Sequence, residues 1–197
     1  MGAAGDANRS VRFTRQRIRT VFFSLLQEKS LHKITVAEIV RRTDISRATF
    51  YLHYTDIYDL VRKTEADIIA QVIREIENFD EDNYVVGEFP IAKKTFAVLM
   101  KYGKEMELLV GENGDVNFMP VMQKALHDYF LTLLQPMIKE QDKLELVLSF
   151  LIGGVLTMFF DNLKSANPKD VHTLAMVANR YLRATNKIIG LPELEPD

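Results

Sequence analysis

The sequence predicts an all-α protein with a small N-terminal domain followed by a larger helical domain. Apolar residues recur at three- and four-residue spacing along most of the 197 residues, which is the period of an α-helix. Residue types that begin helices, such as serine, threonine and aspartate, stand directly before several of these segments. No run shows the apolar–polar alternation of a half-buried strand. These three observations indicate helices throughout.

The first two helices have the clearest signals. The first is expected from Arg15 onward, and the second runs from Val36 to about Thr43. Thr35 and Glu38 have the spacing of a capping box at the start of the second helix, flanked by isoleucines at the positions of a hydrophobic staple. The apolar stripe of the first helix consists of Ile18, Val21, Phe22, Leu25 and Leu26.

A tight turn and two further helices are expected next. Asp44 stands in the turn and is a residue type that tolerates left-handed backbone angles. Ser46 can cap a short third helix, and Thr55 or Asp56 can cap a fourth that ends near Asn78. The remaining helices are expected at Ile91–Tyr102, Lys104–Val110, Met119–Pro136 and Lys143–Leu163, with a last one that has Asn167 as cap, Pro168 at its first position and its end near Gly190.

The charge balance differs between the first 63 residues and the rest of the chain. Residues 1–63 contain 12 Lys/Arg and 6 Asp/Glu, a balance of +6; the rest contains 13 and 21, a balance of −8. This asymmetry favours a basic module that binds a polyanion and an acidic body that does not, although chance clustering gives the same totals. We therefore predict a basic domain at 1–62 that binds a polyanion and a second, acidic domain at 63–197.

The third helix has two unlike faces on a helical wheel. Phe50 and Tyr54 fall on one side and are expected to anchor it to the core. The opposite side carries small, hydroxyl-bearing and aromatic residues, as in the second helix of a helix-turn-helix. Hydroxyls suit phosphate oxygens, a small residue permits close approach to base edges, and arginine suits guanine or phosphate. The DNA-binding candidates are Thr35, Ser46, Arg47, Ala48, Thr49, Tyr51, Leu52, His53 and Thr55; the alternative is a surface helix whose tyrosines pack on neighbours.

Residues 14–62 resemble the N-terminal domain of TetR-family transcriptional repressors. The resemblance rests on the run Ser46, Thr49, Phe50, Tyr51, His53 and Tyr54 in "SRATFYLHY". It implies double-stranded DNA as partner, with Thr49, Tyr51, His53 and their neighbours facing it. Two positions depart from the family pattern: Asp44 replaces the usual turn glycine, and Ile57 replaces a lysine that often contacts phosphate.

The most apolar helix predicts a homodimer. Residues 146–160 contain no charged residue, and a helix that is apolar all round must be buried on more than one side. Two adjacent glycines in it permit close approach of another helix. A four-helix bundle between two copies is expected, with a single large core in a monomer as the alternative. The expected interface residues are Phe150, Gly153, Gly154, Thr157, Leu174, Ala178 and Tyr181.

Methionines and aromatics between these regions suggest a pocket for an apolar effector. Such residues line adaptable pockets, but they more often form an ordinary core. The resemblance implies an inducer at this place; regulation by a protein partner is the alternative. The candidates are Phe96, Met100, Met106, Phe118, Met122, Leu126 and Tyr129.

Other classes of function find little support in the sequence. The four histidines are scattered and no cysteine is present, so neither a metal site nor another cofactor is expected. "GENGD" lacks the spacing and lysine of a phosphate-binding loop, and no serine has the context of a nucleophile elbow. We therefore expect no enzyme. The N-terminus lacks an apolar signal-peptide core and the longest uncharged apolar run is too short to span a bilayer, so a cytoplasmic protein is expected.

Overall fold

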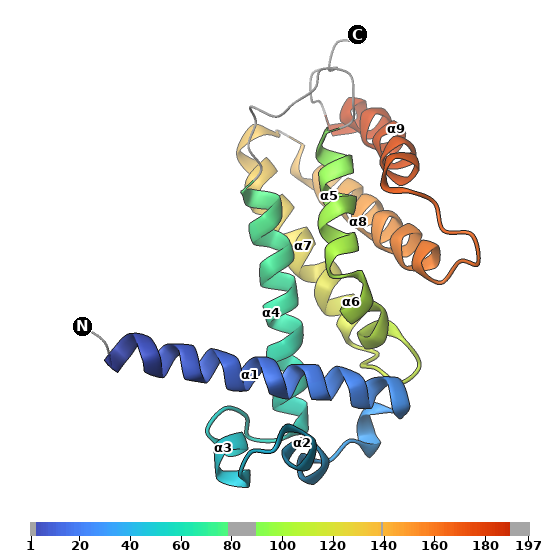
Figure 1. Cartoon of the computed structure of the whole chain (residues 1–197). Coiled ribbons are helices and arrows are strands. Elements are labelled where there is room, and N and C mark those ends of the chain that lie inside the picture. The colour runs from blue at the N-terminus through green and yellow to red at the C-terminus, as the bar shows by residue number, and fades with distance from the viewer. Residues whose placement is uncertain (1–2, 79–89, 139, 190–197) are drawn as a thin grey trace. The chain divides into compact units, whose positions relative to one another are not determined.

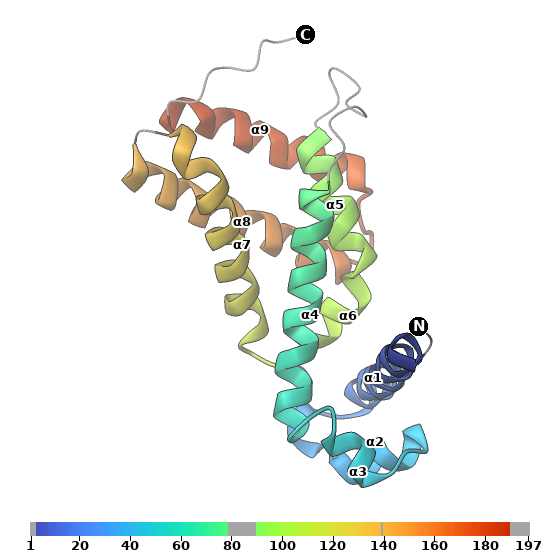
Figure 2. The ribbon, with the colours of Figure 1, turned by 90° about the vertical axis from the view of Figure 1, so that its left-hand side faces the viewer.

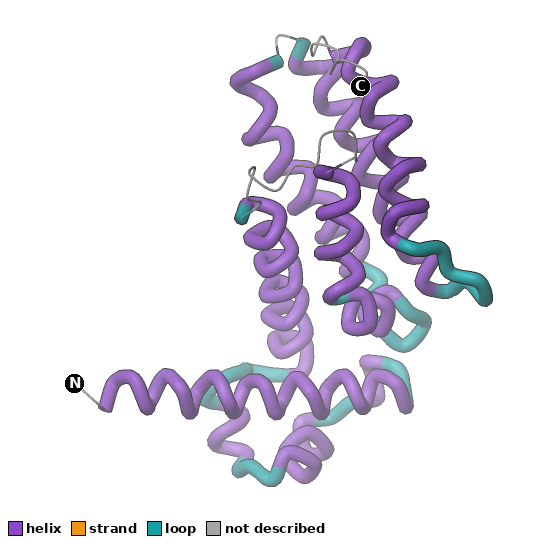
Figure 3. The backbone as a smooth tube through the Cα atoms, turned by 45° about the horizontal axis from the view of Figure 1, so that its top comes forward, coloured by secondary structure: helices purple, strands orange, loops and turns teal. Residues whose placement is uncertain are grey.

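The computed structural model describes residues 3–78, 90–138 and 140–189. Every regular element in this part of the chain is a helix, which confirms the predicted all-α fold (Figure 3). The chain divides into two compact units. The first comprises Met1–Ile68 and Leu108–Val116, and the second comprises Ile69–Glu107 and Asn117–Asp197.

The first unit contains α1, α2, α3 and the beginning of α4, packed around a small apolar core (Figures 1 and 2). Each helix has one apolar stripe, and the side chains of that stripe are fully buried because they face the other helices of the unit. The core members include Ile18, Phe22, Leu25, Leu26, Ile39, Phe50 and Leu60. The bounds are α1 Ala3–Glu28, η1 Leu31–Lys33, α2 Val36–Thr43, α3 Arg47–Tyr51 and α4 Ile57–Glu77.

Helix α4 continues from the first unit into the second without a break between Ile57 and Glu77. The predicted division between residues 62 and 63 therefore falls inside a helix, and it stays a prediction about function. The segment 108–116 returns to the first unit, where the Leu31 amide donates a hydrogen bond of 2.8 Å to the Asn113 carbonyl.

The second unit is a bundle in which α7 packs on α8, α8 on α9 and α9 on α5. Its interior is formed by aromatic and aliphatic side chains, with Phe96, Phe118 and Phe159 completely buried. The bounds are α5 Pro90–Lys101, α6 Gly103–Val110, α7 Phe118–Leu134, η3 Gln135–Met137, α8 Gln141–Leu163 and α9 Val171–Ile189.

Helix α8 is apolar on faces that its own unit does not cover. Leu144, Val147 and Leu156 are buried, whereas Leu146 is 73% and Phe150 is 64% exposed. By length and composition α8 alone among the described helices is apolar enough to cross a membrane, and 33% of its most apolar window is buried. Core helices of soluble bundles pass the same test, and α8 packs against two neighbours as such helices do.

Two helix starts differ from the sequence prediction. Helix α1 begins at Ala3 and not near Arg15, because no proline stands between the two and a helix can extend beyond its apolar stripe. Helix α9 begins at Val171 and not at Pro168, because the Asp170 carboxylate accepts the Thr173 amide at 2.7 Å and is the effective cap. The end predicted near Gly190 lies outside the described residues.

Candidate nucleic-acid interface

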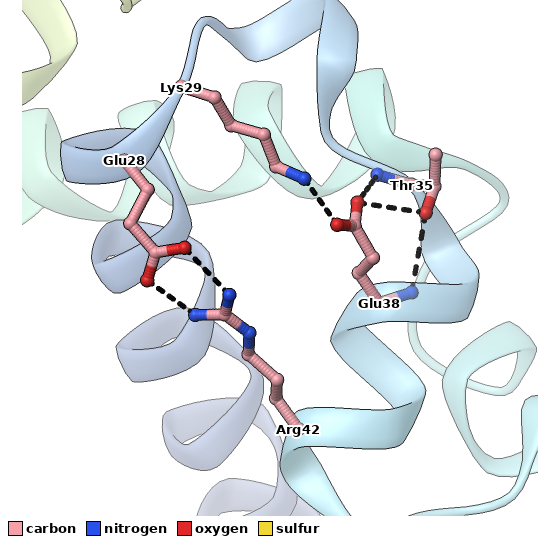
Figure 4. A network of polar contacts seen from close by, with 5 residues as sticks. All are labelled: Glu28, Lys29, Thr35, Glu38 and Arg42. Carbon is pink, nitrogen blue, oxygen red and sulfur yellow. Dashed lines mark hydrogen bonds and ion pairs between the residues drawn. The ribbon is translucent and has the colours of Figure 1, made fainter.

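The start of α2 is fixed by the capping box that the sequence predicts. The Thr35 hydroxyl accepts the Glu38 amide at 3.3 Å, and the Glu38 carboxylate accepts the Thr35 amide at 3.2 Å. Lys29, just beyond the end of α1, forms an ion pair with the same carboxylate (Figure 4). Hydrogen bonds from Lys29 and Thr35 hold the Glu38 pKa below its usual value, so this carboxylate is ionised at neutral pH and keeps its partners.

A second set of polar contacts ties the other end of α2 to α1. Arg42 donates two hydrogen bonds of 2.6 Å to the two carboxylate oxygens of Glu28 (Figure 4). Such bidentate pairing fixes orientation as well as distance. Arg17 of α1 donates to the Thr43 carbonyl at the last residue of α2. Helix α2 is therefore held at both ends, as a scaffold for α3 requires.

The turn between α2 and α3 has the geometry that the sequence predicts. Asp44 has φ 51° and ψ 50° and is the only non-glycine residue with positive φ in the described chain. Its left-handed conformation lets the Ile45 amide reach back to the Val40 carbonyl at 3.3 Å, which closes α2. Ser46 then caps α3 by accepting the Thr49 amide at 3.0 Å, and the two hydroxyls lie 2.8 Å apart.

Helix α3 has one buried and one exposed face, as the wheel predicts. Phe50 is fully buried and Tyr54 is 4% exposed, with ring centroids 5.6 Å apart. On the other side Tyr51 is 53% exposed, and Leu52, in the turn that follows, is 82% exposed. Thr49 is half-buried, while Ser46, Arg47 and Ala48 are exposed. Tyr51 and Leu52 therefore face solvent next to Arg47, and such a group of exposed side chains is typical of a binding surface.

The turn between α3 and α4 is organised by Asp59 and Lys63, which sequence reasoning missed. The Asp59 carboxylate accepts the Thr55 amide at 3.0 Å and pairs with Lys63 at 2.8 Å. Lys63 also donates to the His53 carbonyl at 3.1 Å, and Asp56 caps α4 by accepting the Asp59 amide at 2.7 Å. The spacing of Asp56, Asp59 and Lys63 was the available signal.

His53 lies between α3 and α4 and is half-buried. Partial burial, followed by the positive charges of Arg15 and Lys63, lowers the pKa of its imidazole. A neutral imidazole can donate a hydrogen bond from one nitrogen and accept one on the other. Ile57, at the position where the resemblance implies a lysine, is buried and apolar, so it offers no cation to a phosphate.

The predicted effector residues lie in the second unit and are mostly interior. Met100 is the exception, at 41% exposed on the surface of α5, and Tyr129 is half-buried. The interior members are Phe96, Met106, Phe118, Met122 and Leu126. Their burial fits a pocket lining and an ordinary core equally well.

The predicted interface residues divide into two groups. Leu174 and Ala178 are each 4% exposed and belong to the inner face of α9, so they have little surface left for a second copy. A side chain added at Gly154 would meet nothing within 4 Å, so its own unit gives no reason for a glycine there. The exposed members are Phe150, Gly154, Thr157 and Tyr181, with Gly153 half-buried.

Comparison with known proteins finds a family model that matches the helix-turn-helix segment. Residues 23–64, which include the capping box, the turn and α3, match the family model described as bacterial regulatory proteins of the tetR family. The HTH-type transcriptional regulator YxbF of Bacillus subtilis (strain 168) is 29% identical over 168 residues, which are 82% of this chain. The chain spans 43% of the length of that relative.

Solved structures agree on the fold. A TetR-family transcriptional regulator from Syntrophomonas wolfei has a TM-score of 0.63 at 17% identity, covering 93% of this chain and 99% of that one. A TetR transcriptional regulator from Streptococcus agalactiae 2603V has a TM-score of 0.61 at 18% identity, with coverages of 89% and 96%. The chain therefore has an all-α fold similar to that of TetR-family regulators, and its helix-turn-helix segment matches the model of that family.

Proposed function

We propose that the protein is a cytoplasmic, homodimeric transcriptional repressor that binds a near-palindromic DNA operator through α3. The observation that carries the proposal is the construction of α3. Its Ser46 cap and buried Phe50 fix its orientation, and the opposite side leaves Tyr51 and Leu52 facing solvent. A five-residue helix held this firmly with its large side chains outward is suited to enter a major groove.

Each exposed residue then has a role that its chemistry supports. Arg47 contacts guanine or a phosphate, Ala48 permits close approach, and Leu52 packs against thymine methyl groups. The Tyr51 hydroxyl donates to a phosphate oxygen, and His53 adds a donor beside it. The Thr49 hydroxyl forms a hydrogen bond with the Ser46 hydroxyl in the free protein. A contact from Thr49 to DNA therefore adds to that hydrogen bond or replaces it. The N-terminus of α2, capped by Thr35, and that of α4, which follows Thr55 and is capped by Asp56, are suited to bind phosphates of the DNA backbone.

The uncovered face of α8 and α9 supports a dimer. Leu146 and Phe150 of α8 and Tyr181 and Ile188 of α9 are all more than half exposed. Exposed apolar side chains in such numbers on adjacent helices are typical of an interface between subunits. A two-fold axis through this surface presents two copies of α3, which fit successive major grooves about 34–36 Å apart.

An apolar small molecule bound inside the second unit would release the operator. The two flexible methionines Met106 and Met122 are fully buried among the aromatics, where they can rearrange around a ligand. Release requires that the ligand binds better to the conformation that does not fit DNA. The alternative regulator is a protein partner. A change in operator affinity across a panel of apolar compounds supports the small-molecule reading, and its absence favours the partner.

Selection of bound sequences from random duplex DNA tests the proposal. We expect an enriched motif with two inverted half-sites about one helical turn apart. Tyr51→Ala and Thr49→Ala should each weaken binding to the selected site by about tenfold or more, as loss of a good contact does. Thr132→Ala, which removes an exposed hydroxyl on α7, serves as the matched control. No enriched motif, or full affinity in both α3 variants, would refute the proposal.

A further inference from the structure

The first turns of α1 extend beyond the core of the first unit. From Arg9 to Arg17 every side chain is exposed except the half-buried Thr14, and Ile18 is the first residue to be fully buried. Figure 1 shows these turns reaching past α2 and α3 toward the N-terminus. Two and a half turns of helix without an apolar face to bury gain little stability from packing. Their composition therefore points to a contact outside the chain.

The charge of these turns has one sign. Residues 7–27 contain five arginines and no aspartate or glutamate. Two of the five have partners within the first unit: Arg17 donates to the Thr43 carbonyl, and Arg19 lies 3.5 Å from Asp67. The side chains of Arg9, Arg12 and Arg15 form no ion pair or hydrogen bond within the described part of the chain. Three cations thus remain for a partner that carries negative charge.

These arginines continue the surface of α3. Arg15 is close enough to His53 and Tyr54 to act on both: after burial, its charge helps to lower the His53 pKa, and it opposes the rise that burial causes in the Tyr54 pKa. His53 directly follows the exposed Tyr51 and Leu52, so Arg15 lies beside the exposed side of α3, and Arg12 and Arg9 continue along α1 from there. The three arginines extend over about 9 Å of helix axis at 1.5 Å per residue. A duplex presents a phosphate charge about every 1.7 Å of its axis, which gives each arginine an available partner.

The distribution of apolar residues argues against a membrane as the partner. Val11 and Phe13 are exposed at 39% and 65%, but two positions correspond to about 200° around a helix. They therefore project from opposite sides. A helix that lies in a membrane interface needs one continuous apolar face, and α1 has none in its exposed turns.

We propose that Arg9, Arg12 and Arg15 form a second phosphate-binding surface that extends the DNA contact of α3 along the flanking backbone. This inference rests on the proposed function of α3 and adds a partner-binding role for α1. The contacts are to phosphates only, so they contribute affinity without sequence preference. Each arginine that neutralises a phosphate releases condensed counterions, and removing all three makes binding less dependent on salt.

The test compares two triple variants of the full-length protein. Arg9→Gln, Arg12→Gln and Arg15→Gln together remove three cations from α1, whereas Lys104→Gln, Lys164→Gln and Lys169→Gln remove three exposed cations from the second unit. Binding to a mixed-sequence 40-base-pair duplex is measured by fluorescence anisotropy between 50 and 200 mM KCl. We expect the slope of log K against log [salt] to fall by about 2 to 3 per chain in the α1 variant, and not in the lysine variant.

The outcomes separate this inference from the function on which it rests. If the wild type binds no duplex at any salt concentration, the proposed function fails. If the wild type binds, and Tyr51→Ala weakens it, but the α1 variant keeps the wild-type slope, only the role of α1 is overturned. Arginine-dependent binding to anionic phospholipid vesicles with an unchanged DNA slope overturns it equally. Circular dichroism checks that the α1 variant remains folded, as its exposed positions imply.

Discussion

Replacing Glu65 with glutamine should make the protein more stable at alkaline pH and leave it unchanged in acid. Glu65 lies on α4 within the first unit and is 5% exposed, and one of its carboxylate oxygens has no hydrogen-bond partner in the described part of the chain. Burial, followed by the negative charge of Asp115, raises the pKa of this carboxyl from 4.5 to about 7, against the opposing charge of Arg62. The folded protein therefore holds a proton that the unfolded chain releases.

The sign and size of the effect follow from the two pKa values. Below pH 4.5 both states are protonated, so ionisation of Glu65 has no cost there. Between pH 4.5 and 7 the unfolded chain loses the proton first, so the free energy of unfolding falls as pH rises. One pKa unit corresponds to about 1.4 kcal/mol, so the shift sets an upper limit of about 3 kcal/mol above pH 7. Glutamine has a similar shape and no charge, and it should recover part of this.

Urea unfolding of both proteins at pH 5 and pH 8, at one protein concentration, measures the difference. We expect Glu65→Gln to match the wild type at pH 5 and to exceed it by about 1–3 kcal/mol at pH 8. Asp115→Asn removes the neighbouring charge that helps to raise the Glu65 pKa, so the loss of stability with rising pH should be smaller and should end at a lower pH than in the wild type. Glu112→Gln, exposed in the same loop, is the control and should change neither curve. A glutamine variant that is equally less stable at both pH values would contradict the reasoning.

Two further substitutions have outcomes that follow directly from the structure. Asp44→Val should lower the free energy of unfolding by about 1–2 kcal/mol, because a β-branched residue is strained at the φ of 51° found there, whereas Asp44→Gly should cause no loss; urea unfolding of the pair decides. Phe150→Asp should shift the protein from dimer to monomer in analytical ultracentrifugation at micromolar concentration while its helix content is kept, because its 64% exposed ring lies on the face proposed for the partner.

The features that could be predicted from the sequence are those fixed by neighbouring residues. The capping box of Thr35 and Glu38 can be recognised within a four-residue segment. The left-handed turn at Asp44 can be recognised from that residue and its neighbour. The burial of Phe50 and Tyr54 follows from helical periodicity, which assigns both rings to one face. In each case the physical cause acts within one turn of helix, and the structure shows the expected contact.

The features that sequence reasoning missed either carry no periodic apolar signal or depend on contacts longer than one turn of helix. The N-terminal extension of α1 carries no periodic apolar signal, so its helical start at Ala3 was not predicted. At α9 two capping signals competed. Asp170 prevails over Asn167 because the Asn162 side chain bonds both the amide and the carbonyl of Lys169, at 2.7 and 3.1 Å, and holds the residue before Asp170 outside the helix. Asn162 lies near the end of α8, and its contact with Lys169 spans the connection between α8 and α9.

The contacts of the segment 108–116 indicate how a signal could reach α3. The segment 108–116 lies between α6 and α7 of the second unit in sequence, yet it belongs to the first unit. There Asn113 accepts the Leu31 amide just before α2, and the charge of Asp115 acts on Glu65 of α4. A ligand that moves α6 or α7 would therefore pull on the scaffold of α3 by two routes, the Leu31 hydrogen bond and α4. Burial, followed by the charge of Asp115, raises the pKa of Glu65 to about 7, so moving Asp115 away would lower that pKa and favour release of the proton. Operator release by an effector should then be accompanied by proton release near neutral pH, and Glu65→Gln should abolish it.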